Sequence, residues 1–227
     1  MISILLLVWG DYGWLVEPWK ASWRRFWPEM PEVRVTDWPP QRMRHPSNFS
    51  RLLREELVSM YHPVVLLSPV DTFPIGDLVV TTREMEECAN FIVHAANVVR
   101  FGIAHEDALA AHGERLVTGM KVHRCPEWEH CSGSGGLLMD AALWNRAHLA
   151  SVLQDGWSIS QVEAEGGEWM HSRRPDLISV GLVPGLFHTA KLVDQYRPRA
   201  VRGLGRLDPR DAHAVREAMP GTWEELP

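Results

Sequence analysis

The chain has 227 residues, of which 45% are apolar and 23% are charged. This composition excludes a disordered or low-complexity chain, and the length suffices for a large core without metal or disulfide staples. The net charge of −6 argues against a polyanion binder that relies on overall positive charge. Three cysteines are typical of a reducing compartment. Tryptophan is abundant, with 11 residues against 6 Phe and 3 Tyr, and its amphipathic ring suits both cores and binding clefts.

The apolar segment at residues 2–9 predicts a buried first strand. It is too short to span a bilayer, which takes about 20 residues, and it lacks the basic region and cleavage site of a signal peptide. We therefore expect a cytoplasmic protein with no transmembrane segment. A helix follows with Pro18 in its first turn, and its apolar residues repeat every four positions along one face: Leu15, Trp19, Trp23 and Trp27.

Short β-rich runs alternate with amphipathic segments through the first half of the chain. This alternation is typical of an α/β sheet covered by helices. Polar residues that can cap helices precede two of the amphipathic segments. The expected elements are a strand at 33–36 ending at Asp37, a helix at 49–60 capped by Ser47 or Asn48, a strand at 64–67, a helix from Thr81 or Thr82 through Ile92, and a strand at 97–103.

The second half is harder to divide. It is rich in His and Gly after residue 103, and a glycine-rich segment at 132–136 gives room for a turn or for close approach to a ligand. We expect a helix around residues 143–153 and a final helix beginning at Asp208 and Pro209. No stretch is long and polar enough to force a domain boundary, so a single domain over residues 1–227 is expected.

The order of several short motifs resembles that of bacterial and phage glycosyltransferase-like proteins with the GT-A nucleotide-sugar fold. The resemblance extends to about residue 203. The motifs that carry it are Val-Trp-Gly-Asp-Tyr at 8–12, Glu-Pro-Trp at 17–19, Arg-Phe-Trp-Pro-Glu-Met-Pro at 25–31, Val-Arg-Val-Thr-Asp at 33–37, Asn-Phe-Ser-Arg-Leu-Leu at 48–53, the strand at 64–73, Asn-Val-Val-Arg-Phe at 97–101, Leu-Trp-Asn-Arg at 143–146 and Val-Glu-Ala-Glu-Gly at 162–166.

This resemblance implies an α/β fold whose mixed, mainly parallel sheet is flanked by helices. Residues 1–103 would form the nucleotide-sugar-binding half, 104–207 the acceptor side, and 208–227 a helical tail. The activity implied is transfer of a sugar from a nucleotide-diphosphate donor, such as a UDP-sugar, to a glycan or polysaccharide hydroxyl with inversion. Two alternatives remain. One is transfer to a hydroxymethylated base in phage DNA, with Arg24-Arg25, Arg173-Arg174 and the C-terminal arginines as phosphate contacts. The other is a non-catalytic binding module that kept the fold.

Candidate donor-binding residues follow the first strands. In open α/β sheets the ligand crevice lies at the carboxyl ends of the strands, so Asp11, Tyr12, Asp37 and Asp71 are expected near one mouth. Asp11 or Asp37 would bind the ribose or the base, and Tyr12 or Trp9 would stack on the base. The alternative is that the two Asp residues only shape turns.

Asp71 stands in the register of the family's acidic metal-binding signature, which implies Mn²⁺ or Mg²⁺ against the diphosphate. Val70 replaces the first acidic residue of that signature, so the cation has one carboxylate fewer. An arginine is an alternative source of positive charge. In the family that the chain resembles, the tail folds back toward the donor, and Arg202 is the tail residue expected to contact the donor. The alternative is that the tail arginines only form a solvated surface. These arginines are Arg197, Arg199, Arg202 and Arg206.

The resemblance implies that Glu163 is the general base, because an inverting transfer needs a carboxylate beside the acceptor hydroxyl and the family has a Glu at this register. Glu165 and Glu168 compete for this role, and each of the three is also consistent with a solvated surface charge. Tryptophans near this segment could stack on a sugar or pack in the core: Trp144, Trp157 and Trp169.

A zinc site is a further hypothesis for the His- and Cys-rich stretch. Its residues have ligand chemistry, although their spacing fits no standard zinc finger. The alternative is a loop with free thiols. The residues concerned are His123, Cys125, His130 and Cys131.

Overall fold

The computed structural model describes residues 2–36, 38, 48–76, 79–104, 121–124, 139–183, 186–193 and 199–226. Within them the main sheet has seven strands in the order β2-β1-β3-β7-β5-β8-β6. Their bounds are β1 Ile2–Leu7, β2 Val33–Val35, β3 Val64–Pro69, β5 Val98–Gly102, β6 Lys121–Arg124, β7 Ala142–Asn145 and β8 Ile178–Val183.

The main sheet is mixed, with three parallel and three antiparallel pairings between neighbouring strands, so the expectation of a mainly parallel sheet is not met. β2, β1 and β3 run parallel to one another, and β5 runs parallel to β8. β7 lies antiparallel between β3 and β5, and β6 is antiparallel to β8. The predicted α/β class with a mixed sheet flanked by helices is therefore confirmed. Because β7 comes from the second half of the chain, the two expected halves share one continuous sheet.

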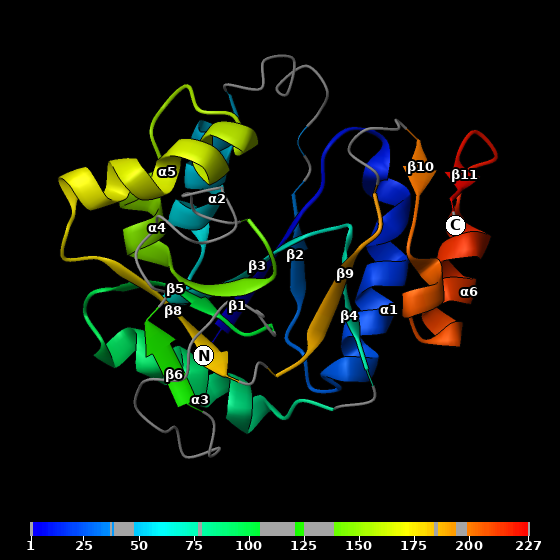
Figure 1. The fold of residues 1–227 in the computed structure, drawn as a ribbon, viewed down its shortest axis with the longest axis horizontal. Helices are drawn as coiled ribbons and strands as arrows, with labels where there is room; N and C mark the ends of the chain where they lie inside the picture. The colour runs from blue at the N-terminus through cyan, green and yellow to red at the C-terminus, as the bar shows by residue number, and fades with distance from the viewer. Residues whose placement is uncertain are drawn as a thin grey trace.

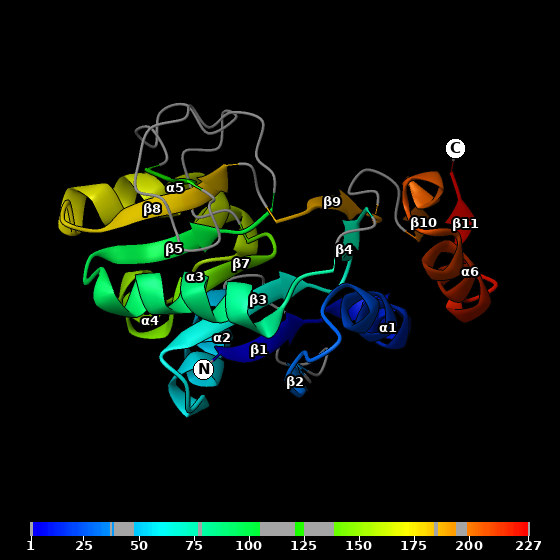
Figure 2. The same ribbon diagram turned by 90° about the horizontal axis from the view of Figure 1, so that it is seen from below.

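Helices cover both faces of this sheet (Figures 1 and 2). α1 Val16–Phe26 and α3 Thr82–His94 share one hydrophobic cluster with one face of the strands. α2 Phe49–Ser59, α4 Arg146–Val152 and α5 Ile159–Arg173 share a second cluster on the opposite face. Alternate residues of β1 and β3 enter the two clusters, as the two-residue period of a strand requires. No helix in the described ranges combines the length and the apolar character that a bilayer crossing needs.

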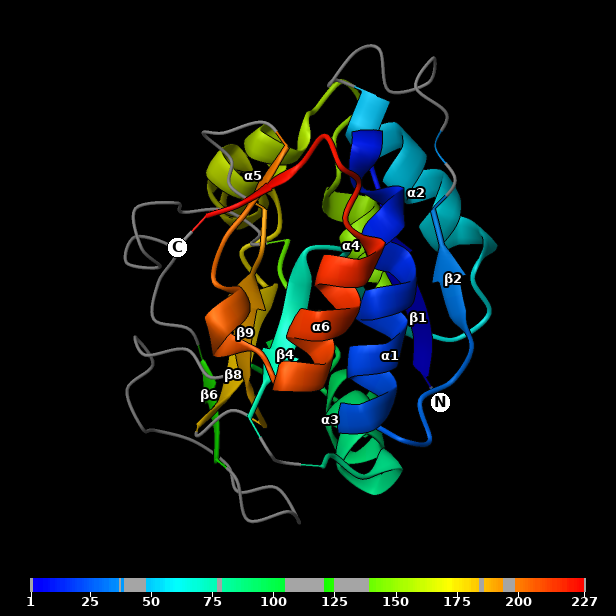
Figure 3. The same ribbon diagram turned by 90° about the vertical axis from the view of Figure 1, so that its right-hand side faces the viewer.

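Two small ribbons and a final helix extend the carboxyl end of the sheet on the side of α1. β4 Thr72–Ile75 pairs antiparallel with β9 His188–Lys191, and β10 Ala200–Val201 pairs with β11 Glu224–Glu225. α6 Pro209–Ala218 lies beside α1 (Figure 3). Short 3₁₀ helices occur at η1 Gly10–Leu15 and η3 Leu204–Arg206.

A buried polar network holds α6 against α1. The Ser22 hydroxyl donates to the Asp211 carboxylate at 2.7 Å, and the Arg25 guanidinium donates to the same carboxylate. Arg25 also lies 3.4 Å from Asp208, the residue that caps α6. A buried carboxylate is tolerated only when it is paired in this way. The network therefore fixes where the C-terminal segment crosses the molecule.

The predicted elements of the first half are confirmed with small shifts at their ends. α1 buries Trp19 and Trp23, and Trp27 directly follows it as a buried C-cap residue. Asn48 precedes α2, but its side chain makes no capping hydrogen bond there. α6 begins after Asp208, as predicted.

The helix predicted around residues 143–153 is wrong at its start. Leu143 and Trp144 belong to β7, and the helix begins at Arg146 with Asn145 accepting a hydrogen bond from His148 N–H at 3.1 Å. Leu143 pairs with Leu66 on one side and with Phe101 on the other. A short run buried on both faces lacks the alternation that would mark it as a strand.

The N-terminus of α3 is closed by a capping box, which makes a stability prediction possible. Thr81 Oγ1 accepts from Glu84 N–H at 3.2 Å, and the Glu84 carboxylate accepts from Thr81 N–H at 2.8 Å. Thr81→Ala is expected to lower the free energy of unfolding by about 1 kcal/mol. Urea denaturation monitored by circular dichroism measures this loss. Thr81→Ser keeps the hydroxyl and is the control, and an equal loss in both variants would contradict a capping role.

Candidate functional site

The carboxyl ends of β1 and β3 lie side by side and bring the predicted donor residues to one edge. Leu7 pairs with Pro69, and Val70 N–H donates to the Leu7 carbonyl at 3.0 Å. β1 then leads into η1, which carries Asp11 and Tyr12, and β3 leads into the turn that carries Asp71. The sheet therefore places both segments at the edge where α/β proteins bind ligands.

Asp71 is a half-buried carboxylate between β3 and β4. Burial raises its pKa above the ordinary aspartate value, Lys191 opposes the rise, and the negative charge of Glu163 adds to it. Its carbonyl accepts a hydrogen bond from Leu192 N–H at 2.9 Å. The backbone of the turn is thus held next to β9, and the neighbouring carboxylates of Asp71 and Glu163 form a site that a cation would stabilise.

Glu163 reaches the same edge from the opposite face of the sheet. It lies near the start of α5, whose N-terminus is fixed by a capping box between Ser158 and Gln161. Its carboxylate accepts from Met139 N–H at 3.1 Å and is half-buried. The competing residues Glu165 and Glu168 are exposed. Glu163 is therefore the one of the three candidates that is both anchored and close enough to Asp71 to affect its pKa.

A buried ion pair, missed by sequence reasoning, supports the segment that contacts Glu163. Arg100 on β5 is buried, and one of its guanidinium nitrogens lies 2.7 and 2.9 Å from the two oxygens of Asp140. The guanidinium also lies 5.9 Å from the centre of the Trp144 ring, within cation–π range. Asp140 directly follows Met139, so this pair fixes the backbone that donates to Glu163. The sequence signal that could have indicated this pair is the arginine inside an otherwise apolar strand, Val-Val-Arg-Phe.

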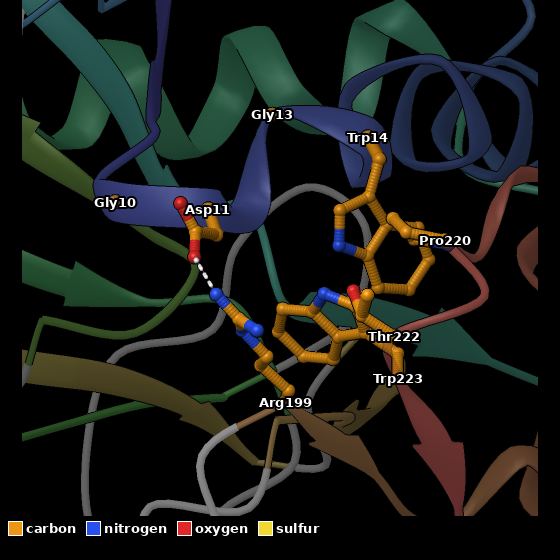
Figure 4. Close-up of a pocket in the computed structure, with 8 residues that line it drawn as sticks. All are labelled: Gly10, Asp11, Gly13, Trp14, Arg199, Pro220, Thr222 and Trp223. Atoms are coloured by element: carbon orange, nitrogen blue, oxygen red, sulfur yellow. Dashed lines mark ion pairs between the residues drawn. The ribbon is translucent and has the colours of Figure 1, made fainter.

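A pocket of about 470 Å³ opens between η1 and the C-terminal segment (Figure 4). Asp11 and Arg199 form an ion pair of 3.5 Å at its rim. Trp14 and Trp223 form one wall, with ring centroids 5.2 Å apart. The remaining lining residues are small or polar and leave backbone accessible: Gly10, Gly13, Pro220 and Thr222.

Tyr12 links this pocket to Asp71. Its ring lies edge-on to Trp9, at 6.0 Å, and to Trp223, at 5.5 Å. Burial raises the pKa of its phenol, and the charges of Asp71 and Asp11 raise it further. Tyr12 is therefore a neutral aromatic group whose pKa responds to both carboxylates and whose ring packs against Trp9 and against Trp223 of the pocket wall.

The tail arginines are distributed unevenly around the site. Arg199 reaches the pocket with its backbone in the left-handed region, at φ 61°. Arg202 has an exposed side chain, and its N–H donates at 2.8 Å to the carbonyl of Leu192, the residue whose own N–H bonds the Asp71 carbonyl. Arg206 is exposed on η3. The C-terminal segment thus returns to η1, where Arg199 forms an ion pair with Asp11.

Of the three tryptophans proposed to flank Glu163, one lies in the core and two are partly buried. Trp144 on β7 is completely buried, so its candidacy as a cleft residue was wrong. Trp157 and Trp169 are half-buried, contact each other with ring centroids 5.9 Å apart, and pack against the cluster of α2, α4 and α5.

The arginines considered for DNA contacts are partly engaged within the protein. Arg25 binds Asp208 and Asp211 of the buried network. Arg174 lies 2.8 Å from Asp176. Such pairing reduces the positive charge that these side chains offer to a phosphate backbone.

The described residues offer few ligands to a metal ion. Within the described ranges no group of three or more His, Cys, Asp or Glu side chains could hold one. Val70, at the position where the resemblance implies the first acidic residue of the pair, is buried in the core and offers no ligand. Asp71 therefore fits a Mg²⁺ or Mn²⁺ only if the ion also takes oxygens from a diphosphate and from water, which is how Mg²⁺ is usually held.

Several predicted residues lie outside the described part of the chain. Asp37 and Arg197 are among them. So are three of the four zinc candidates, while His123 lies on β6. The zinc site and the role of Asp37 stay predictions; the undescribed zinc candidates are Cys125, His130 and Cys131.

No protein-family model matches this chain, and no curated protein matches it. The functional assignment therefore depends on the geometry of the site and on the motifs that resemble the GT-A glycosyltransferases.

Proposed function

We propose that this protein is a GT-A-type glycosyltransferase that moves a sugar from a nucleotide-diphosphate donor to a glycan hydroxyl with inversion. The observation that carries the proposal is the order of groups along the carboxyl edge of the sheet. The negative charge of Glu163 raises the pKa of Asp71, and the charge of Asp71 raises the pKa of Tyr12. Asp11, beside Tyr12 in the sequence, lines the pocket and forms an ion pair with Arg199.

This order matches the parts of a nucleotide sugar. The pocket with its two indole rings suits the nucleoside, because aromatic faces and edges bind bases and Asp11 offers oxygens to ribose hydroxyls. Asp71 suits the diphosphate through a shared cation. Arg199 and Arg202 suit the phosphate oxygens, since a guanidinium binds phosphate in a bidentate manner. The sugar would then lie between Asp71 and Glu163.

Glu163 would act as the general base. As the acceptor oxygen bonds to the anomeric carbon, the bond from that carbon to the diphosphate oxygen breaks, and the acceptor proton passes to the Glu163 carboxylate. Met139 N–H holds one oxygen of this carboxylate. When bound with the donor, Mg²⁺ or Mn²⁺ would neutralise charge on the diphosphate leaving group, and Asp71 would be its protein ligand.

Binding and transfer assays with a panel of nucleotide sugars, in Mn²⁺ and in chelator, test the proposal. We expect binding and turnover with at least one donor. Thr222→Trp, which places a large side chain in the pocket, is expected to weaken donor binding, whereas Thr222→Ser should not. Binding without turnover on any acceptor favours the binding module, and turnover only on hydroxymethylated DNA favours the phage-type alternative. If the protein neither binds nor turns over any donor of the panel, the glycosyltransferase proposal is wrong.

A further inference from the structure

Two tryptophans of α1 donate hydrogen bonds to the same backbone carbonyl, the one that follows Asp71. The indole Nε1–H groups of Trp19 and Trp23 reach the Thr72 carbonyl at 3.0 and 3.3 Å. Both side chains are completely buried, and their rings stack with centroids 5.2 Å apart and planes 28° from parallel. The periodicity of α1 explains their burial, but it does not explain why both donors meet at one acceptor.

The pairing of β4 explains why this carbonyl needs partners. Leu192 N–H bonds to the Asp71 carbonyl, so the next pair, Thr72 with Lys191, is a non-hydrogen-bonded pair of the antiparallel ribbon. In such a pair the backbone groups point away from the partner strand. The Thr72 carbonyl therefore faces α1 instead of β9, in a buried place where an unpaired carbonyl is costly. The two indoles satisfy it.

The Asp71 turn is consequently anchored on three sides. Val70 N–H bonds to β1 through the Leu7 carbonyl, and the Asp71 carbonyl accepts from Leu192 beside β9. The third anchor, from α1, is the indole pair on Thr72. Two anchors hold the turn within the strands, and only the third ties it to a helix.

We propose that Trp19 and Trp23 are positioning residues that hold the Asp71 carboxylate at the donor site through the Thr72 carbonyl. The benefit of this arrangement for donor binding rests on the proposed function. The anchoring of the turn does not, and it has its own readout. A carboxylate that shares a cation with a diphosphate must be placed within fractions of an ångström, and supporting groups commonly determine that placement.

The test compares phenylalanine variants, which keep an aromatic ring but remove the indole donor: Trp19→Phe, Trp23→Phe and the double variant. Trp27→Phe is the matched control. Trp27 is equally buried and follows the same helix, but its Nε1–H donates to Thr82 Oγ1 at 3.0 Å, away from Asp71. Thermal unfolding of all variants shows whether their losses of stability are comparable.

Two measurements decide the result. Amide hydrogen exchange of Val70 and Leu192 by NMR reports the turn without any ligand, and both amides should exchange about tenfold faster in the double variant than in the Trp27→Phe control. Binding of UDP with Mn²⁺ by calorimetry should weaken about tenfold in the double variant, equivalent to about 1.4 kcal/mol, and change less than twofold, on the order of experimental scatter, in the control. If the double variant does not fold, the single variants serve with smaller effects.

Unchanged exchange at Val70 and Leu192 in the double variant, or an equal change in Trp27→Phe, would overturn the positioning role. If the wild-type protein binds no nucleotide, the proposed function fails, but the exchange measurement still decides whether the indoles hold the Asp71 turn.

Discussion

Glu163→Gln is expected to reduce sugar transfer by about 10²- to 10⁴-fold, the usual contribution of a general base, while donor binding stays unchanged. Glutamine keeps the size of the side chain and an oxygen that can still accept from Met139 N–H, so the local structure should persist. It cannot take the acceptor proton. Single-turnover transfer with saturating donor, together with donor binding by calorimetry, measures the two quantities separately.

Glu165→Gln is the matched control for this variant. Glu165 lies on the same helix two residues further on and is exposed, so its replacement should leave transfer at the wild-type rate. Full activity in Glu163→Gln would remove Glu163 from the role of base. A collapse of donor binding in that variant would instead assign Glu163 to the donor site.

Asp71→Asn is expected to weaken donor binding in Mn²⁺ by about 100-fold, the upper end of losses seen when groups that support a metal are changed. Asparagine keeps one oxygen but loses the charge that would hold the cation. Added chelator should weaken donor binding to the wild-type protein and have little further effect on the variant. If chelator does not weaken donor binding to the wild-type protein, no cation is needed, and Arg199 and Arg202 would supply the positive charge on the diphosphate instead.

Asp71→Asn, although it weakens donor binding, should raise the stability of the protein at neutral pH. Because the fold raises the pKa of Asp71, the native state keeps this proton to a higher pH than the unfolded state does. The wild-type protein therefore loses stability as pH rises from the ordinary aspartate pKa through the raised one. Asp71→Asn is spared that loss. Its melting temperature should exceed that of the wild type at neutral pH, and the difference should disappear at acidic pH, where both side chains are neutral.

Local signals in the sequence predicted the elements whose determinants lie within a few residues. The four-residue repeat of Trp19 and Trp23 predicted α1, Thr81 with Glu84 forms the expected helix start, and Asp208 with Pro209 marks the start of α6. Convergence of Tyr12 and Asp71 followed from a general property of parallel sheets, that their carboxyl ends share one edge.

The features that sequence reasoning missed depend on partners far apart in the chain. β7 is a strand because Leu143 finds Leu66 and Phe101 on either side. The pocket wall forms only when Trp223, more than two hundred residues from Trp14, folds back onto it. No periodicity within a short window carries such information.

The place of β7 in the sheet also has a consequence for how the chain acquires its structure. β3 and β5 are separated in space by a strand that comes later than both, so neither can complete its hydrogen bonds until residues 142–145 have arrived. β3 and β5, made first during synthesis, leave two edges open in the meantime, and open edges invite association between chains. A fragment ending near residue 103 would therefore lack the strand that joins β3 to β5, and we expect it not to form this sheet.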